Sequence, residues 1–213
     1  MSPVTKGEER GTGIMSYVRL KIAVMAVALS AAAAPAGHAE VLALRSCNWC
    51  HGGSGQGYTP APRLAGQRPQ YVETQLMNFS MHTRDNPFSK MYMWGAAANL
   101  SPQVAHDLAA YYSTLTPRAA NDGDRALVAE GRAIYQEGMP DSNIVACVVC
   151  HAPNAEGVRG IPRLGGLGYS YLKRRLEQWG EGYHAAAGPM PSIAGKLSED
   201  QIEALASYLS FVK

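Results

Sequence analysis

The sequence predicts an all-α protein made of two similar halves, and three observations support this prediction. Apolar residues recur three and four positions apart in several segments, which is the period of an amphipathic helix. No segment alternates apolar and polar residues as a half-buried strand does. The chain also repeats itself, because a spacing of 100 residues aligns one short motif and much of the sequence after it.

The repeat preserves residue type at a spacing of 100 residues that later shortens. At 100 residues the matches are Pro62-Arg63-Leu64 with Pro162-Arg163-Leu164, Gly66 with Gly166, Tyr71 with Tyr171, Leu76 with Leu176, and the aromatic pair Phe79 and Trp179. The spacing then drops to 97, as a three-residue deletion would produce, and pairs Leu100 with Leu197, Ser101 with Ser198 and Tyr111 with Tyr208. Such spaced identities indicate duplication of a domain.

Each half has the same predicted order of elements. A Gly-rich loop follows the repeated motif (residues 52–62 and 152–162), and a helix follows the loop (residues 69–80 and 169–179). An irregular stretch containing Met comes next, and a helix closes the half. Ser101 before Pro102, and Ser198 three residues before Gln201, are capping signals for the two closing helices.

The domain boundaries follow from helix breakers. Pro117 and Gly123 mark a linker over residues 116–124, so the predicted domains are residues 40–115 and 125–213. A helix from about residue 124 to Glu137 opens the second domain. Only residues 40–46 precede the motif of the first domain, so its opening helix is expected to be very short or absent.

Residues 1–39 resemble a secretory signal peptide. Arg19 and Lys21 form a basic region, residues 22–34 are apolar or small, and Gly37-His38-Ala39 fits a small-x-small cleavage site. The apolar run is shorter than the ~20 residues of a membrane-spanning helix, so cleavage is favoured over anchoring. Met15 begins a more typical signal peptide than Met1, so the first 14 residues are a candidate mis-assigned start.

The repeated motif is C-x-x-C-H, at Cys47 to His51 and at Cys147 to His151. Two thiols on one helical turn can each form a thioether with a haem vinyl group, and the following imidazole can then bind the iron. All four cysteines of the chain belong to these motifs. A redox dithiol or half of a zinc site are the alternatives for one copy. Two copies behind an export signal predict two covalently attached haems. The attachment residues would be Cys47, Cys50, His51, Cys147, Cys150 and His151.

Methionines are the candidates for the sixth iron ligand. Met190 is the only methionine after His151, and its thioether would raise the reduction potential and close the iron to substrates. Met190 and Met93 each lie seven residues before the matched leucines Leu197 and Leu100, so the register selects Met93 in the first half. Met91 is the alternative there, while Met77 fits a core position. His82, His106 and His184 are weaker candidates for a bis-His site.

Two further pairs are candidate haem contacts. Pro62 and Pro162 each follow the motif histidine by eleven residues, and a proline carbonyl there could accept the imidazole Nδ1–H and orient the ring. Arg63 and Arg163 could pair with haem propionates. A solvated loop charge is the alternative for these arginines.

These residues resemble the dihaem cytochromes c4 and the related c553-type class I cytochromes c. The similarity covers nearly all of the chain after the signal segment. It depends on both C-x-x-C-H motifs, on P-R-L-A-G-Q-x-x-x-Y-x-x-x-Q-L from residue 62 to 76, on A-A-x-L-S from residue 97 and on A-A-Y-Y from residue 109. It implies two tandem class I cytochrome c domains, each around one haem c with His/Met ligation.

The same resemblance implies a periplasmic electron carrier rather than an enzyme. Its donor would be a quinol-oxidising complex or a dehydrogenase, and its acceptor a terminal oxidase or reductase. A haem subunit of a dehydrogenase complex, or a dihaem enzyme oxidising a small inorganic substrate such as thiosulfate, are the alternatives. The chain beyond residue 39 has as many basic as acidic residues, which argues against nucleic acid and leaves at most peripheral membrane association.

Overall fold

The computed structural model describes residues 36–213, so the predicted signal segment lies almost entirely outside the described residues. Residues 37–213 form one compact unit that contains both predicted domains. Within the described part the fold is all-α, as predicted, and extended pairing is limited to isolated bridges such as Tyr58 with Ala61. No described helix is long and apolar enough to cross a membrane.

Among the described residues, the first half contains four α-helices. They are α2 (Ala36–His51), α3 (Pro69–Ser80), α4 (Trp94–Ala97) and α5 (Pro102–Thr114), with the π-helical turn η1 (Ser89–Met93) directly before α4. Helix α5 packs against α3 and buries Leu108 and Tyr112. Ser101 caps α5 as predicted, since its hydroxyl accepts from the amide of Val104.

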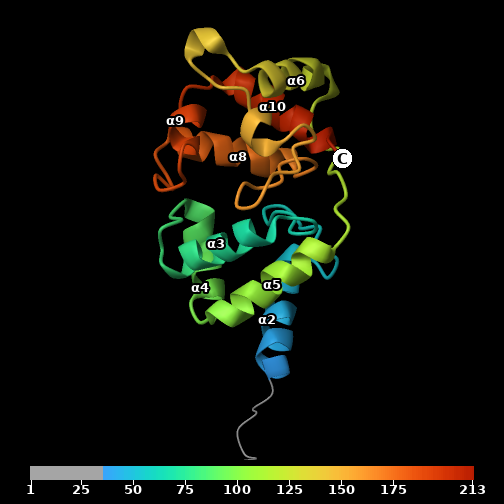
Figure 1. Ribbon diagram of the computed structural model, residues 1–213, viewed down its shortest axis with the longest axis vertical. Coiled ribbons are helices and arrows are strands. Elements are labelled where there is room, and N and C mark those ends of the chain that lie inside the picture. Colours follow the sequence, from blue (N-terminus) through green and yellow to red (C-terminus); the bar gives the residue numbers. More distant parts are fainter. Residues whose placement is uncertain (1–35) are drawn as a thin grey trace, which may run out of the picture. The chain divides into compact units, whose positions relative to one another are not determined.

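The second half follows the same plan with an added opening helix. It comprises η2 (Arg125–Leu127), α6 (Val128–Glu137), η3 (Pro140–Ser142), α7 (Val148–His151), α8 (Tyr169–Gly180), α9 (Met190–Ala194) and α10 (Glu199–Phe211). In Figure 1 these helices, yellow to red, gather around α8 and α10, and those of the first half gather around α3 and α5. The predicted capping box of Ser198 and Gln201 begins α10.

The core of the second half depends on the close crossing of α6 and α10. Gly131 of α6 makes this crossing possible, because a Cβ at that position would collide with the carbonyl of Ala204. Tyr135 and Tyr208 from the two helices pack with their ring centroids 5.6 Å apart. The crossing fixes the helix that closes the half against the helix that opens it.

The opening of the first half differs from the expectation of a very short or absent helix. Helix α2 passes the predicted cleavage site and continues without a break through the motif to His51. The reason is local, because residues 40–51 contain neither Gly nor Pro. In the second half Gly138 and Pro140 end α6, so that motif occupies the separate helix α7.

The Met-containing stretches are also more regular than expected. Residues 89–97 form η1 and α4, and Met190 begins α9 with Pro189 at its N-cap. Proline suits the first turn of a helix, because the backbone N–H that it lacks would have no acceptor within the helix there. Flanking prolines therefore position this methionine rather than exclude it from a helix.

Candidate functional site

Both motifs end on a helical turn that presents two thiols. Cys50 and Cys150 are exposed, Cys47 and Cys147 are half-buried, and all four are free. Burial raises the pKa of Cys47 and raises that of Cys147 to about 11. Redox-active dithiols need a lowered pKa to form the nucleophilic thiolate. The half-buried cysteine of each motif therefore lacks the lowered pKa of an activated thiolate.

The two motif histidines are held in the same way. The Nδ1 atom of His51 lies 2.8 Å from the carbonyl oxygen of Pro62, and that of His151 lies 3.1 Å from the carbonyl of Pro162. Both rings are buried, and burial lowers both pKa values although the carbonyls oppose it. A neutral ring that donates through Nδ1 keeps the lone pair of Nε2 free for a metal.

The Gly-rich loops bring the proline carbonyls back to the histidines. The amide of Gly57 donates to the carbonyl of His51 at 2.8 Å, and the amide of Gly157 donates to that of His151 at 2.9 Å. Gly57 has φ +80°, and a Cβ there would lie 2.6 Å from the carbonyl oxygen of Ala61. Only glycine allows this return of the chain, so the loop composition serves the orientation of the imidazole.

The candidate sixth ligands differ in exposure. Met93 and Met190 are half-buried, whereas the Met91 side chain is 69% exposed. Met93 ends the π-helical turn η1, a distortion that occurs often at functional sites. Met93 is thus the more buried of the two candidates, and its assignment as the ligand stays a prediction.

The three other histidines have contacts of their own. His82 is exposed and stacks on Trp94 with ring centroids 4.0 Å apart. His106 is exposed and lies 3.3 Å from a carboxylate oxygen of Glu73. His184 is buried, with its Nδ1 atom 3.4 Å from a terminal nitrogen of Arg175. Each of these histidines thus has a protein contact of its own, and their weaker candidacy as iron ligands stays a prediction.

Arg63 does not serve mainly as a loop charge. It is buried and donates to three carbonyls outside the first domain, those of Arg118 at 2.6 Å, Gly166 at 2.7 Å and Gly165 at 2.6 Å. Its Nε is buried without a partner, and that N–H stays available to the expected propionate. Arg163, the matched residue, is half-buried, and only its backbone groups bond across the halves, both with the side-chain amide of Gln67.

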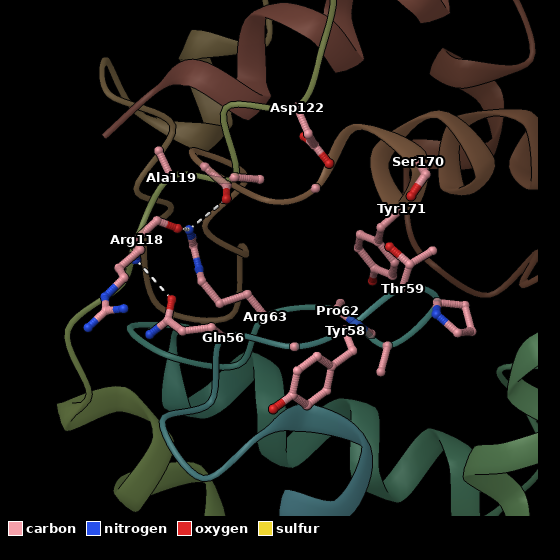
Figure 2. Close-up of a pocket in the computed structure, with 16 residues that line it drawn as sticks. Gln56, Tyr58, Thr59, Pro62, Arg63, Arg118, Ala119, Asp122, Ser170 and Tyr171 are labelled. Carbon is pink, nitrogen blue, oxygen red and sulfur yellow. Dashed lines mark hydrogen bonds between the residues drawn. The ribbon is translucent and has the colours of Figure 1, made fainter.

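Figure 2 shows Arg63 reaching across a cleft of about 380 Å³. The loop around Tyr58 forms one wall, and residues 118–122 and 166–171 line the others. The cleft contains none of the motif residues and neither candidate methionine. It is therefore a space beside the contact between the halves rather than the expected haem site.

Sequence reasoning missed the most unusual polar residues of the described structure. Arg84 and Arg175 are each only 6% exposed, and Trp179 buries its indole nitrogen. The repeat register could have pointed to them, because positions 75 and 175 and positions 84 and 184 are matched pairs that differ in kind. Their burial, however, is a property of the packed halves.

The buried polar atoms test whether haem fits. Three buried side-chain atoms in the described residues have no hydrogen-bond partner, and all three are N–H donors: Nε of Arg63, Nε of Arg84 and Nε1 of Trp179. Haem supplies carboxylate acceptors through its propionates. Together with the presented thiols and the two neutral imidazoles, these donors fit a haem-binding chain.

Comparison with known proteins agrees with this geometry. The family model for cytochrome c matches residues 128–213. Cytochrome c4 of Pseudomonas aeruginosa is 33% identical over 89% of this chain and 94% of its own. The solved cytochrome c4 of Acidithiobacillus ferrooxidans superposes with a TM-score of 0.73 at 33% identity, over 78% of this chain and 98% of that one.

The chain belongs to the cytochrome c4 family. It is thus a dihaem c-type cytochrome that carries electrons, with haem c as its iron-containing cofactor, and not an enzyme. Another relative is described as the thiosulfate dehydrogenase electron acceptor of Thiomonas intermedia, and it is 35% identical over 78% of this chain and 77% of its own. Redox proteins are therefore the general class of partner for this cytochrome c4.

Proposed function

We propose that this cytochrome c4 is a periplasmic carrier of single electrons. Its donor would be a quinol-oxidising complex or a dehydrogenase, and its acceptor a terminal oxidase or reductase. The observation that supports the proposal is the pair of equivalent sites, in which a buried neutral histidine donates to a proline carbonyl beside two presented thiols. A chain that holds two such sites can accept and pass on electrons one at a time.

The proposed attachment uses every cysteine and histidine of the two motifs. Cys47 and Cys50 would hold one haem and Cys147 and Cys150 the other, with His51 and His151 as the proximal ligands. Bound haem supplies the reversible one-electron chemistry of its iron. The protein keeps each imidazole neutral by burial, and the carbonyls of Pro62 and Pro162 fix the tautomer and the orientation of the ring.

Met93 and Met190 are the proposed sixth ligands. A thioether favours ferrous iron, so it raises the reduction potential, and it also closes the coordination sphere. Replacing Met93 by Ala should lower one of the two reduction potentials, remove one iron–sulfur charge-transfer band and allow carbon monoxide to bind one haem. Met190→Ala should do the same at the other.

Met91→Ala is the matched control, because Met91 lies in the same turn but points its side chain to solvent. A spectroelectrochemical titration of the periplasmically matured protein should show two components for this variant, each with its charge-transfer band. If Met91→Ala loses a band and Met93→Ala does not, the assignment of the first site is wrong.

Export and domain division belong to the same proposal. Residues 1–39 would be removed, and residues 40–115 and 125–213 would each enclose one haem. The intact mass of the mature protein checks cleavage and the number of haems, since it should equal the chain from residue 40 plus two haems, and the masses of haem peptides after proteolysis in the 116–124 linker check that each domain carries one. A mass that retains residues 1–39 would contradict cleavage, and a mass with one haem would contradict two attachment sites.

A second candidate donor follows from the Thiomonas relative, which is named for its reduction by thiosulfate dehydrogenase. This chain could accept electrons from an enzyme of that kind, either as a free carrier or as a haem subunit of the complex. Stopped-flow reduction by a thiosulfate dehydrogenase with thiosulfate, compared with reduction by a quinol-oxidising complex, distinguishes the donors. Co-elution of the native protein with a dehydrogenase would favour the subunit.

A further inference from the structure

His82 has a backbone conformation that glycine normally adopts. It follows the C-cap of helix α3 with φ +61°, and its amide donates to the carbonyl of Phe79 at 3.1 Å. Gly182 occupies the matched position after α8 with φ +89°, and its amide donates to the carbonyl of Trp179, also at 3.1 Å. A left-handed backbone is unfavourable for a residue that has a Cβ. The first half therefore carries a strained histidine where the second half has the favoured residue.

The ring of His82 has a partner that the second half lacks. It stacks on Trp94, with the ring centroids 4.0 Å apart and the planes tilted by 14°. At the spacing of 97 residues, Trp94 matches Pro191, so the second half has neither ring of the stack. Aromatic pairs at this distance are favourable beyond the area that they bury. The stack thus offsets the strain at His82, which indicates that the two rings serve one purpose.

Trp94 ends the turn that carries Met93. The backbone amide of Trp94 donates to the carbonyl of Ser89 and closes the π-helical turn η1. Its indole Nε1 donates to the carbonyl of Arg84 at 2.9 Å. At the other end of η1, the hydroxyl of Ser89 donates to the side chain of Asn86, and both residues are buried. Buried contacts therefore fix the start of the turn, and the side chain of Trp94 fixes its end.

Helix α4, which follows the turn, has few buried contacts of its own. It packs against α3 and is four residues long, and Ala97 is its one buried residue. A Cβ on Gly95 would meet no atom within 4 Å. A single helical turn is unstable by itself, because its hydrogen bonds do not offset the entropy of ordering it. Trp94 is the largest side chain of α4, so its stack with His82 is a principal contact of the helix.

The second half fastens its methionine helix in another way. Helix α9 packs against α8, and a Cβ on Gly180 would lie 3.7 Å from the Cα of Gly195. Two backbones approach closely there because neither residue has a side chain. The matched positions of the first half are Ser80 and Ala98, which do have side chains. Close backbone approach thus holds the helix of Met190, whereas an aromatic stack holds the turn of Met93.

We propose that His82 is a positioning residue for the first iron site, because its ring holds Trp94 and thereby the turn that presents Met93. The inference rests on the proposed function, in which Met93 is the sixth ligand. Loss of the stack would free the turn without altering the thioether itself. The first site would then open to an external ligand more often, and the second site would not change.

Four variants of the mature dihaem protein separate the stack from the strain. His82→Gly removes the ring, relieves the strain and reproduces the residue of the second half. His82→Asn removes the ring but keeps a residue that tolerates positive φ without the freedom of glycine. His82→Phe restores an aromatic ring. His106→Asn is the matched control, because His106 is an exposed histidine of the same half whose contact is with Glu73.

Two measurements follow the turn and the site separately. Amide hydrogen exchange, read by mass spectrometry, reports the opening of residues 89–97 whatever ligand the iron has. Titration of the ferric protein with imidazole, read at the iron–sulfur charge-transfer bands, reports how readily a thioether is displaced. Met93→Ala identifies the component that belongs to the first site.

His82→Gly and His82→Asn should each speed exchange over residues 89–97 by about threefold to tenfold, which is what an aromatic pair contributes. The affinity of the first site for imidazole should rise by the same factor, since a site that opens more often binds more tightly. Residues 190–194 and the second site should not change. His82→Phe and His106→Asn should stay within about twofold of the native protein.

The unfolding temperature distinguishes positioning from a purely structural role. In His82→Gly the lost stack lowers the stability, whereas relief of the strained backbone raises it. The unfolding temperature of this variant should therefore change little while its imidazole affinity rises. A residue that served the fold alone would not separate the two readouts in this way.

Unchanged exchange over residues 89–97 in both His82→Gly and His82→Asn would overturn the proposal, because the stack would then not hold the turn. Faster exchange with an unchanged imidazole affinity would also overturn it, since His82 would then act on the fold alone. So would a His82→Phe protein that behaves like His82→Asn. Failure of the proposed function is distinguishable, because both charge-transfer bands would then survive Met93→Ala.

Discussion

Replacing Arg63 by Ala tests how the two halves are joined. The guanidinium makes three charge-assisted hydrogen bonds to backbone carbonyls beyond the first domain, all between 2.6 and 2.7 Å. Its side chain is 6% exposed. The variant leaves three carbonyl oxygens without this donor and opens the contact that Figure 2 displays.

The magnitude follows from opposing contributions. A hydrogen bond to a charged group contributes about 1.5–3 kcal/mol, and a buried carbonyl left without its donor costs about 1–3 kcal/mol. The variant also removes the unfavourable burial of Arg63, and water can enter from the adjoining cleft of about 380 Å³ to reach the carbonyls. We therefore expect a loss of about 2–4 kcal/mol in the free energy of unfolding, combined from these ranges.

Thermal and guanidinium unfolding of the mature ferric protein, followed by circular dichroism, measure this loss. For a chain of this length it corresponds to a fall of roughly 5–15 °C in the unfolding temperature. The two halves should also begin to unfold separately, because the contact that couples them is weakened.

Arg163→Ala is the matched control. Arg163 occupies the same position of the repeat, but its side chain is half-buried and makes no hydrogen bond in the described structure, so a loss below about 1 kcal/mol is expected. The reasoning is refuted if Arg63→Ala costs less than about 1 kcal/mol, or if the two variants are equally destabilising.

Two further predictions concern the second half and a control in the first. Gly131→Ala should destabilise the protein by about 1–3 kcal/mol, because the new Cβ meets the carbonyl of Ala204. Gly95→Ala is the control, since no atom lies within 4 Å of its new Cβ, and it should be neutral or stabilising by up to about 1 kcal/mol. Equal unfolding midpoints for the two variants would contradict the crossing. Burial and the neighbouring guanidinium groups lower the pKa of His184 to about 4 from an ordinary 6.5. The unfolded chain therefore takes up this proton first, so the native protein should lose up to about 3 kcal/mol relative to His184→Gln as the pH falls from 6.5 to 4. Parallel stability curves for the two proteins across this range would show that His184 is not held neutral.

Much of the chain could be predicted from local pattern. Capping by Ser101 and Ser198 depends on residues within one turn, so the starts of α5 and α10 were readable. The length of α2 differs from the expectation, because a helix can begin before the predicted cleavage site and residues 40–51 contain no Gly or Pro to end it. The approach of Pro62 to His51 was expected from an eleven-residue spacing, and the structure shows the contact at 2.8 Å.

The sequence by itself determined that this protein is helical, duplicated and able to attach two haems, because those properties depend on short spacings that any fold must respect. Only the tertiary structure decided the burial and the hydrogen-bond partners of its arginines. Arg63 and Arg163 occupy one position of the repeat, yet one guanidinium binds carbonyls of the other half and the other does not. Arg84 and Arg175 are unmatched in sequence and alike in surroundings. The physical reason is that the packing of the two halves sets which arginines are buried and which groups they bond. The order of residues in the sequence does not specify which surfaces of the halves meet.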